Sequence, residues 1–189
     1  MEAVFRKEII VNKTLSQAMW VLTFVILTSL GAFVRIPLPF TPVPITLQTL
    51  FVLLAGILLG GNLGSISQLI YLLLGVSGVP IFTGAVSGLS YIFGPTGGYL
   101  WGFVLANLFL ARFVRYAKTN LLAIFGLVCM ADFLILASGV AWLKLISGYS
   151  LGKLLFIGFI PFIPGDLLKA LIASILYLKL KTRLKELST

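Results

Sequence analysis

Two ionisable side chains near the C-terminus have a spacing that suits a ligand-binding pair. Asp166 and Lys169 are three residues apart, which places both on one face of a helix. Asp166 follows Pro164 and Gly165, where a helix is expected to restart, and the N-terminus of a helix stabilises a carboxylate. Ionisable groups inside apolar segments usually face a bundle interior or a cavity. We therefore expect the pair to contact a ligand, with a mutually neutralising structural pair as the alternative.

Other polar and aromatic side chains could complete such a site. Thr46 and Gln48 are candidate substrate-binding residues. The Gln48 amide carries both a donor and an acceptor, which suits an amide-like or urea-like ligand. A hydrogen bond between helices is the alternative for Gln48. Tyr91 and Tyr99 flank a glycine-rich turn and are the better pocket candidates among the tyrosines. A place in an interfacial aromatic belt is the alternative for both.

Asp132 is the other acid in an apolar segment. A role in a proton relay is one interpretation of this residue. We favour a structural aspartate that is hydrogen-bonded to a neighbouring helix, because the sequence has no histidine and Asp166 is expected nearer the outer end. Cys129 is the single cysteine, so it forms no intrachain disulfide and is interpreted as a small apolar core residue.

Several chemistries have no motif in this sequence. Gly148–Leu154 has the wrong spacing for a nucleotide-binding P-loop and no hydroxyl after its lysine. The chain contains no G-x-S-x-G motif, no Cys/His set and no carboxylate cluster for a metal. We expect a protein that does not hydrolyse ATP itself, is not an enzyme and holds no metal or cofactor.

The composition of the chain identifies the solvent that its elements must face. Of the 189 residues, 60% are hydrophobic and only 10% are charged, and the mean hydropathy is +1.14. A soluble domain of this size could not bury so much apolar surface. The net charge of +9 comes from basic residues at the edges of apolar runs, which is typical of membrane topology. These features exclude soluble, disordered and nucleic-acid-binding proteins and predict a chain embedded in a lipid bilayer.

Glycines, prolines and charges divide the chain into six predicted membrane spans. No charged residue occurs from Ile36 to Ala111, so glycines and prolines must break that stretch. The predicted fold is all-α: one compact bundle of six transmembrane helices that forms a single membrane domain over residues 1–189. The expected spans are roughly 15–34, 46–59, 63–76, 97–110, 120–143 and 151–178.

The distribution of basic residues predicts the orientation of this bundle. Most of them fall on the side of the two termini: Arg6, Lys7, Lys13, Arg112, Arg115, Lys118, Lys179, Lys181, Arg183 and Lys185. Arg35, Lys144 and Lys153 fall on the opposite side. The positive-inside rule then places both termini in the cytoplasm. The irregular segments 35–45, 77–96 and 161–165 collect on the outer side, which predicts a ligand pocket open to the outside.

Several sequence blocks resemble a known family. They are Pro42-Val-Pro-Ile-Thr-Leu-Gln-Thr49, Leu53-Leu-Ala-Gly56, Leu59-Gly60, Tyr71-Leu-Leu-Leu-Gly75, Gly78-Val-Pro-Ile-Phe82, Gly94-Pro-Thr-Gly-Gly-Tyr-Leu100 and Pro161-Phe-Ile-Pro-Gly-Asp166-Leu-Leu-Lys169. Their order and content resemble BioY, the biotin-binding S components of energy-coupling factor (ECF) transporters. The resemblance covers about residues 42–100 and 161–170. It implies six helices, an outer pocket for biotin, a bacterial cell membrane, and partnership with a transmembrane T component and two ABC-type ATPases.

The resemblance also suggests roles for individual residues. Asp166 and Gln48 would bind the ureido head of biotin, and Lys169 would bind its carboxylate or orient Asp166. Tyr91, Tyr99 and Phe82 would pack against the rings. Three alternatives remain open at this point: an S component for a different vitamin, a membrane enzyme that uses Asp132 or Asp166 as an acid or base, and transport by this chain alone.

Overall fold

Helices make up most of the described part of the chain, in a computed structural model that describes residues 13–60, 62–117 and 120–188. Arg6, Lys7 and Lys118, on which the predicted orientation partly depends, lie outside these ranges. The elements in chain order are α2 (Lys13–Phe33), β1 (Arg35–Ile36), β2 (Ile45–Thr46), α3 (Gln48–Leu58), α4 (Leu63–Val76), α5 (Leu89–Ile92), α6 (Gly97–Phe113), η1 (Val114–Ala117), α7 (Leu121–Ser147), α8 (Leu151–Gly158), η2 (Ile160–Phe162) and α9 (Ile163–Ser188).

The helices have the length and the surface of membrane spans. Within the described ranges, four helical segments are long and apolar enough to cross a bilayer: Thr14–Phe33, Gly97–Ala117, Leu121–Ser147 and Leu151–Lys181. Leu122 and Leu145 on α7 are 76% and 78% exposed, as expected of side chains that face lipid. These features indicate an all-helical membrane protein. The apolar helices α3 and α4 are shorter, so the count of six spans stays a prediction.

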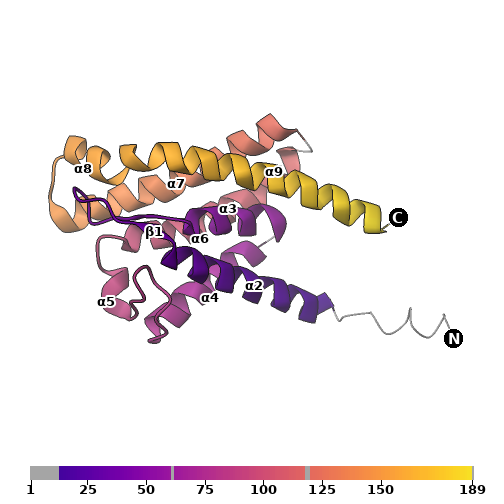
Figure 1. Cartoon of the computed structure of the whole chain (residues 1–189), viewed down its shortest axis with the longest axis horizontal. Coiled ribbons are helices and arrows are strands. Elements are labelled where there is room, and N and C mark those ends of the chain that lie inside the picture. Colours follow the sequence, from indigo (N-terminus) through magenta and orange to yellow (C-terminus); the bar gives the residue numbers. More distant parts are fainter. Residues whose placement is uncertain (1–12, 61, 118–119, 189) are drawn as a thin grey trace.

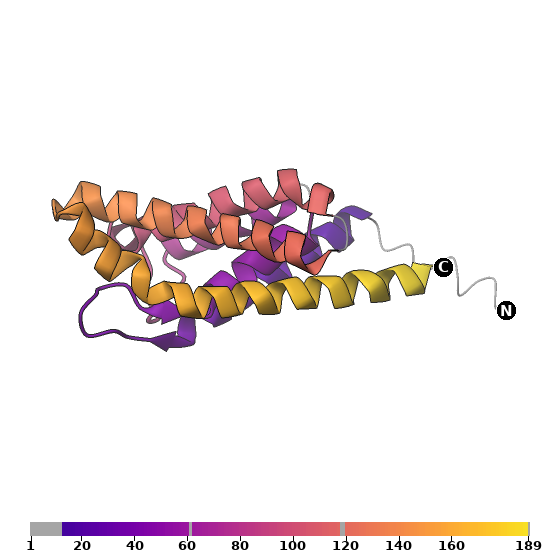
Figure 2. The ribbon, with the colours of Figure 1, turned by 90° about the horizontal axis from the view of Figure 1, so that it is seen from above.

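The elements separate into two ends of an elongated bundle. The start of α2, the end of α6, the start of α7 and the end of α9 lie at one end (Figures 1 and 2). The β1–β2 hairpin, α5 and α8 gather at the opposite end (Figures 1 and 2). The irregular segments of the chain therefore lie together at one end, which we call the loop end.

Four prolines determine the shape of the first loop at this end. Pro37, Pro39, Pro42 and Pro44 cannot continue a helix, so the chain leaves α2 and returns in an extended form. β1 and β2 pair antiparallel, with Arg35 opposite Thr46. The hairpin delivers the chain directly to the first turn of α3, which begins at Gln48.

The C-terminal apolar segment is broken near the loop end. α8 stops at Gly158, the short helix η2 contains Pro161, and α9 begins at Ile163. Proline at the start of a helix costs no hydrogen bond, because the first N–H groups have no partner within the helix. The restart was expected at Pro164–Gly165 and occurs at Ile163, which leaves Asp166 in the first turn of α9.

Close packing of α6 against α7 depends on glycines. A side chain at Gly98 would collide with Trp142 Cβ and Ser138 O, and one at Gly102 would lie 2.8 Å from Ile135 Cα. Small residues of this kind let transmembrane helices approach closely. Ser138 Oγ also donates a hydrogen bond to Gly98 O at 2.9 Å. This contact fixes the position of α6, whose first turns form one wall of the site described below.

Candidate ligand-binding pocket

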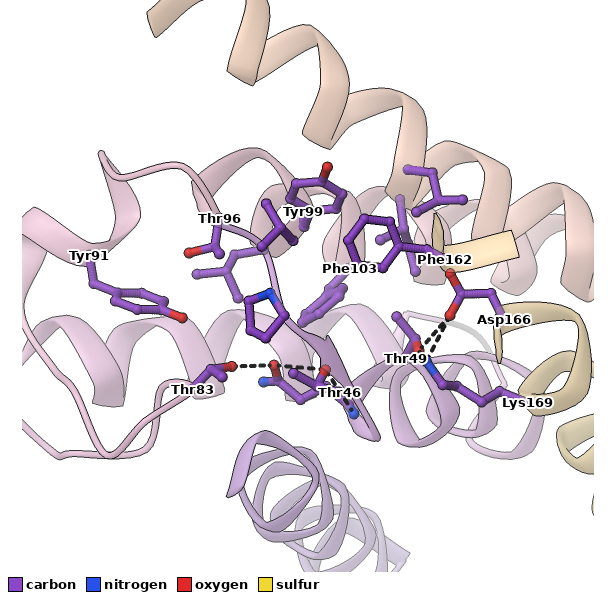
Figure 3. Close-up of a pocket in the computed structure, with 16 residues that line it drawn as sticks. Thr46, Thr49, Thr83, Tyr91, Thr96, Tyr99, Phe103, Phe162, Asp166 and Lys169 are labelled. Carbon is purple, nitrogen blue, oxygen red and sulfur yellow. Dashed lines mark hydrogen bonds and ion pairs between the residues drawn. The ribbon is translucent and has the colours of Figure 1, made fainter. Parts of the chain in front are cut away.

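A cavity of about 50 Å³ lies between α3, α6, α7 and α9 near the loop end (Figure 3). We call it the inner cavity. Its wall is mostly apolar, with polar groups from α3, from α9, from the first loop and from the second loop, which is the segment 77–88 between α4 and α5. The lining residues are Val43, Pro44, Thr46, Gln48, Thr49, Thr83, Tyr91, Thr96, Tyr99, Leu100, Phe103, Ile135, Leu136, Phe162, Asp166 and Lys169. An apolar pocket with a few convergent polar groups is the usual form of a small-molecule site.

Asp166 and Lys169 form an ion pair in this wall. Lys169 Nζ donates to Asp166 Oδ1 at 2.7 Å and to Thr49 Oγ1 at 2.8 Å. Thr49 Oγ1 in turn donates to Asp166 Oδ1 at 3.3 Å (Figure 3). Asp166 and Lys169 are only 4% and 8% exposed. The carboxylate and the ammonium neutralise each other, as buried charges must, and the Thr49 hydroxyl hydrogen-bonds to both.

Gln48 is held by hydrogen bonds on both sides of its amide. Its Nε2 donates to Tyr71 Oη at 2.7 Å, and its Oε1 accepts from Thr83 Oγ1 at 3.0 Å. Tyr71 is fully buried and donates to Ile81 O at 3.2 Å. Gln48 therefore joins α3 to α4 and the second loop while it also lines the inner cavity. The two interpretations of Gln48 made from the sequence do not exclude each other.

Aromatic rings form much of the apolar wall. Tyr99 and Phe103 lie one turn apart on α6, and Tyr91 and Phe162 come from other segments (Figure 3). The Tyr99 hydroxyl donates to Gly158 O at 2.6 Å, so its donor is already used in joining α6 to α8. Tyr99 thus offers the cavity its ring rather than a free hydroxyl.

Phe82 does not line the inner cavity, unlike the other six residues suggested as contacts for a ligand. Its side chain is fully buried. The ring stacks on Tyr91 with 4.8 Å between centroids and meets the edge of Tyr71 at 5.5 Å. A side chain at Gly75 would overlap the Phe82 ring. Phe82 therefore supports the Tyr91 ring from behind.

Sequence reasoning missed several lining residues. Phe103 follows Tyr99 by four residues on one helix face, and this spacing could have identified it. Thr49 and Thr83 carry no comparable signal, because hydroxyl residues are common in apolar segments. Thr49 contacts Asp166, and Thr83 contacts Gln48. In each pair the two residues are far apart in sequence, so the sequence does not reveal the contact.

A second cavity, the outer cavity, adjoins the inner cavity at the loop end. It has a volume of about 470 Å³ and is lined by Arg35, Pro37, Leu38, Thr41, Pro42, Pro44, Thr83, Val86, Ser90, Tyr91, Gly94, Pro95 and Thr96. Pro44, Thr83, Tyr91 and Thr96 line both cavities. The shared walls make the two cavities the inner and outer parts of one pocket.

Asp132 lies outside this pocket, on a crevice of about 190 Å³ between α7 and α9. The residue is 5% exposed, and its Oδ1 is buried without a hydrogen-bond partner in the described part of the chain. The expected hydrogen bond to a neighbouring helix is therefore not formed by this oxygen. Nor do the described residues contain a group of three or more His, Cys, Asp or Glu that could hold a metal ion.

Replacing Asp132 with Leu is expected to stabilise the protein. The change removes a buried unpartnered oxygen, which costs about 1–3 kcal/mol, and the adjacent crevice accommodates the larger side chain. We expect the thermal midpoint of the detergent-solubilised protein to rise by about 2–12 °C. Asp132→Asn, which keeps a polar group at the position, is the matched control and should gain less. A lowered midpoint for Asp132→Leu would show that the carboxylate has a stabilising partner.

Comparison with known proteins finds one family over nearly the whole chain. The model of the BioY family matches residues 6–186. A probable biotin transporter BioY of Pyrococcus horikoshii is 42% identical over 153 residues, which is 81% of this chain and 88% of that protein. The biotin transporter BioY of Thermotoga maritima is 36% identical over 170 residues, or 84% and 91% of the two chains. The crystal structure of the S-component for biotin from an ECF-type ABC transporter matches with a TM-score of 0.85 and 28% identity, over 91% of this chain and 94% of that one.

Proposed function

This chain belongs to the BioY family, and we propose that it is the substrate-binding subunit of a biotin uptake transporter. The observation that carries the proposal is the two-part pocket at the loop end, in a chain whose relatives are biotin transporters. The family consists of transporter subunits, so an enzymatic role for Asp132 or Asp166 has no support.

The chemistry of the inner cavity suits the head of biotin. The bicyclic head carries ureido N–H donors, one carbonyl acceptor and an apolar thioether ring. We infer that Asp166 accepts from the ureido N–H groups and that Gln48 and Thr46 bind near the carbonyl. The rings of Tyr91 and Tyr99 would pack against the head, with Phe82 supporting Tyr91 from behind. Lys169 orients the Asp166 carboxylate through their 2.7 Å contact.

We further propose that the chain crosses the membrane six times, with both termini in the cytoplasm. The four long helices would be joined as spans by α3 and α4, whose shortness local bilayer thinning can accommodate. An even number of spans is consistent with the start of α2 and the end of α9 lying at the same end (Figure 1). The basic residues Lys179 and Lys181 near the end of α9 favour the cytoplasm for that end.

We further propose that uptake depends on partners that hydrolyse ATP, in line with the similarity to a subunit of an ABC transporter. Biotin would be captured at the loop end from outside the cell. A transmembrane T component and two ABC-type ATPases would then reorient the bundle so that biotin is released inside. The similarity to an S-component from an ECF-type ABC transporter supports this assembly.

Direct binding of biotin to the purified, detergent-solubilised protein tests the proposal. We expect tight, saturable binding in the absence of ATP, measured by isothermal titration calorimetry, and no binding of thiamine or riboflavin. Selective binding of either control vitamin would instead identify an S component for a different substrate. A folded, monodisperse sample that binds none of the three would contradict the proposed function.

A further inference from the structure

The outer cavity contains one charged side chain among the described residues that line it, that of Arg35. The rest of its wall consists of prolines, hydroxyl residues and apolar groups. No acidic residue occurs between Glu8 and Asp132 in the sequence, so neither loop brings a carboxylate to this cavity. The outer part of the pocket is therefore positively charged, because no carboxylate among its described lining residues neutralises Arg35.

The backbone holds Arg35 between the two loops and beside the inner cavity. Arg35 pairs with Thr46 across the β1–β2 ladder, and Thr46 lines the inner cavity. On the other side its guanidinium lies against Gly84 of the second loop, where a Cβ would be 2.6 Å from Nη1. Gly84 has a φ of +91°, which favours glycine at this position as well. The absence of a side chain at Gly84 gives the guanidinium its place at the wall of the outer cavity.

The two cations of the pocket differ in what they already bind. Lys169 Nζ donates to both Asp166 and Thr49, so its charge is neutralised within the wall. The Arg35 side chain makes no hydrogen bond or ion pair with any part of the chain that the structure describes, and it is exposed. A planar guanidinium with free donors is well suited to bind a carboxylate in a bidentate manner.

Biotin carries such a carboxylate at the end of its valerate tail. The inner cavity disfavours that group, because its wall is mostly apolar and its cation, Lys169, is already paired with Asp166. We propose that Arg35 binds the tail carboxylate in the outer cavity and so selects ligands with a free acid over ligands with a neutral tail. This inference rests on the proposed function, because it assigns the second end of the same ligand.

The test compares biotin with biotinamide, in which a carboxamide replaces the carboxylate. Both ligands are titrated into the wild-type protein, Arg35→Gln and Arg35→Lys in detergent at constant ionic strength. Loss of a hydrogen-bonded ion pair should weaken biotin binding to Arg35→Gln by about tenfold or more. Biotinamide binding should change by less than about twofold. Arg35→Lys keeps the charge but loses the bidentate geometry, so it should retain part of the preference for biotin.

Lys153→Gln is the matched control. Lys153 belongs to α8 at the loop end, lies over the Tyr149 ring at 3.5 Å and lines neither cavity. Its removal should leave both affinities unchanged. The inference is overturned if Arg35→Gln weakens both ligands equally, if it weakens neither, or if Lys153→Gln reproduces its effect. A wild-type protein that binds neither ligand would instead refute the proposed function, so the two failures are distinguishable.

Discussion

Asp166→Asn is expected to weaken biotin binding by about 100-fold or more. The substitution keeps the size of the side chain but removes the carboxylate that we propose accepts from the ureido head. It also leaves the Lys169 ammonium, which is 8% exposed, with neutral acceptors in place of a carboxylate: the amide oxygen of the new asparagine and Thr49 Oγ1. Breaking a buried ion pair in this way costs about 3–5 kcal/mol. We expect this cost to be divided between the free energy of folding and the free energy of biotin binding. Calorimetric titration measures the loss of biotin affinity, and thermal unfolding of the same sample measures the loss of stability.

The double variant Asp166→Asn/Lys169→Met separates folding from binding. Lys169→Met alone should destabilise the protein, because it leaves the Asp166 carboxylate buried with Thr49 as its remaining partner in the described structure. Removing both charges leaves no uncompensated ion, so the thermal midpoint of the double variant should exceed that of either single variant. Biotin binding should stay lost. Wild-type affinity in a folded Asp166→Asn protein would refute the role of this carboxylate.

Gly102→Val is expected to disrupt the contact between α6 and α7. The new Cβ would lie 2.8 Å from Ile135 Cα and 3.1 Å from Ile135 O. Backbone atoms of α7 cannot rotate aside as a side chain could, so the helices must separate. Overpacking of this severity costs roughly 3 kcal/mol, which corresponds to a thermal midpoint roughly 6–12 °C lower. Size-exclusion chromatography of the heated, solubilised protein measures the midpoint.

Gly126→Val is the matched control for this experiment. Gly126 lies on α7 and is exposed, and a Cβ built there meets no atom within 4 Å. The control makes the same substitution in a helix of the same bundle, so it measures how valine in place of glycine changes the thermal midpoint without a clash between helices. Biotin affinity should fall with stability for Gly102→Val, because α6 carries Tyr99 and Phe103 and α7 carries Ile135. Equal midpoints for the two variants would show that the close approach at Gly102 does not stabilise the bundle.

The glycine contacts illustrate a limit of sequence reasoning. Helices were predictable because an apolar chain in a bilayer must satisfy its backbone hydrogen bonds internally. The break before α9 was predictable because proline lacks an N–H donor. The sequence does not reveal which glycines meet another helix: Gly102 and Gly126 both lie within apolar helices, yet only Gly102 closely approaches the partner backbone. That difference depends on the rotation of each helix about its axis.

The sequence by itself determined the class of the protein, its irregular loops and the ionisable pair in the first turn of α9. Composition, proline chemistry and the three-residue spacing of Asp166 and Lys169 are local properties, so they can be read without a fold. Only the tertiary structure decided that Thr49 completes this pair, that Phe82 supports Tyr91 from behind, and that Arg35 reaches the outer cavity past Gly84. The physical reason is that these contacts join residues far apart in sequence, whose meeting depends on how the helices and loops pack.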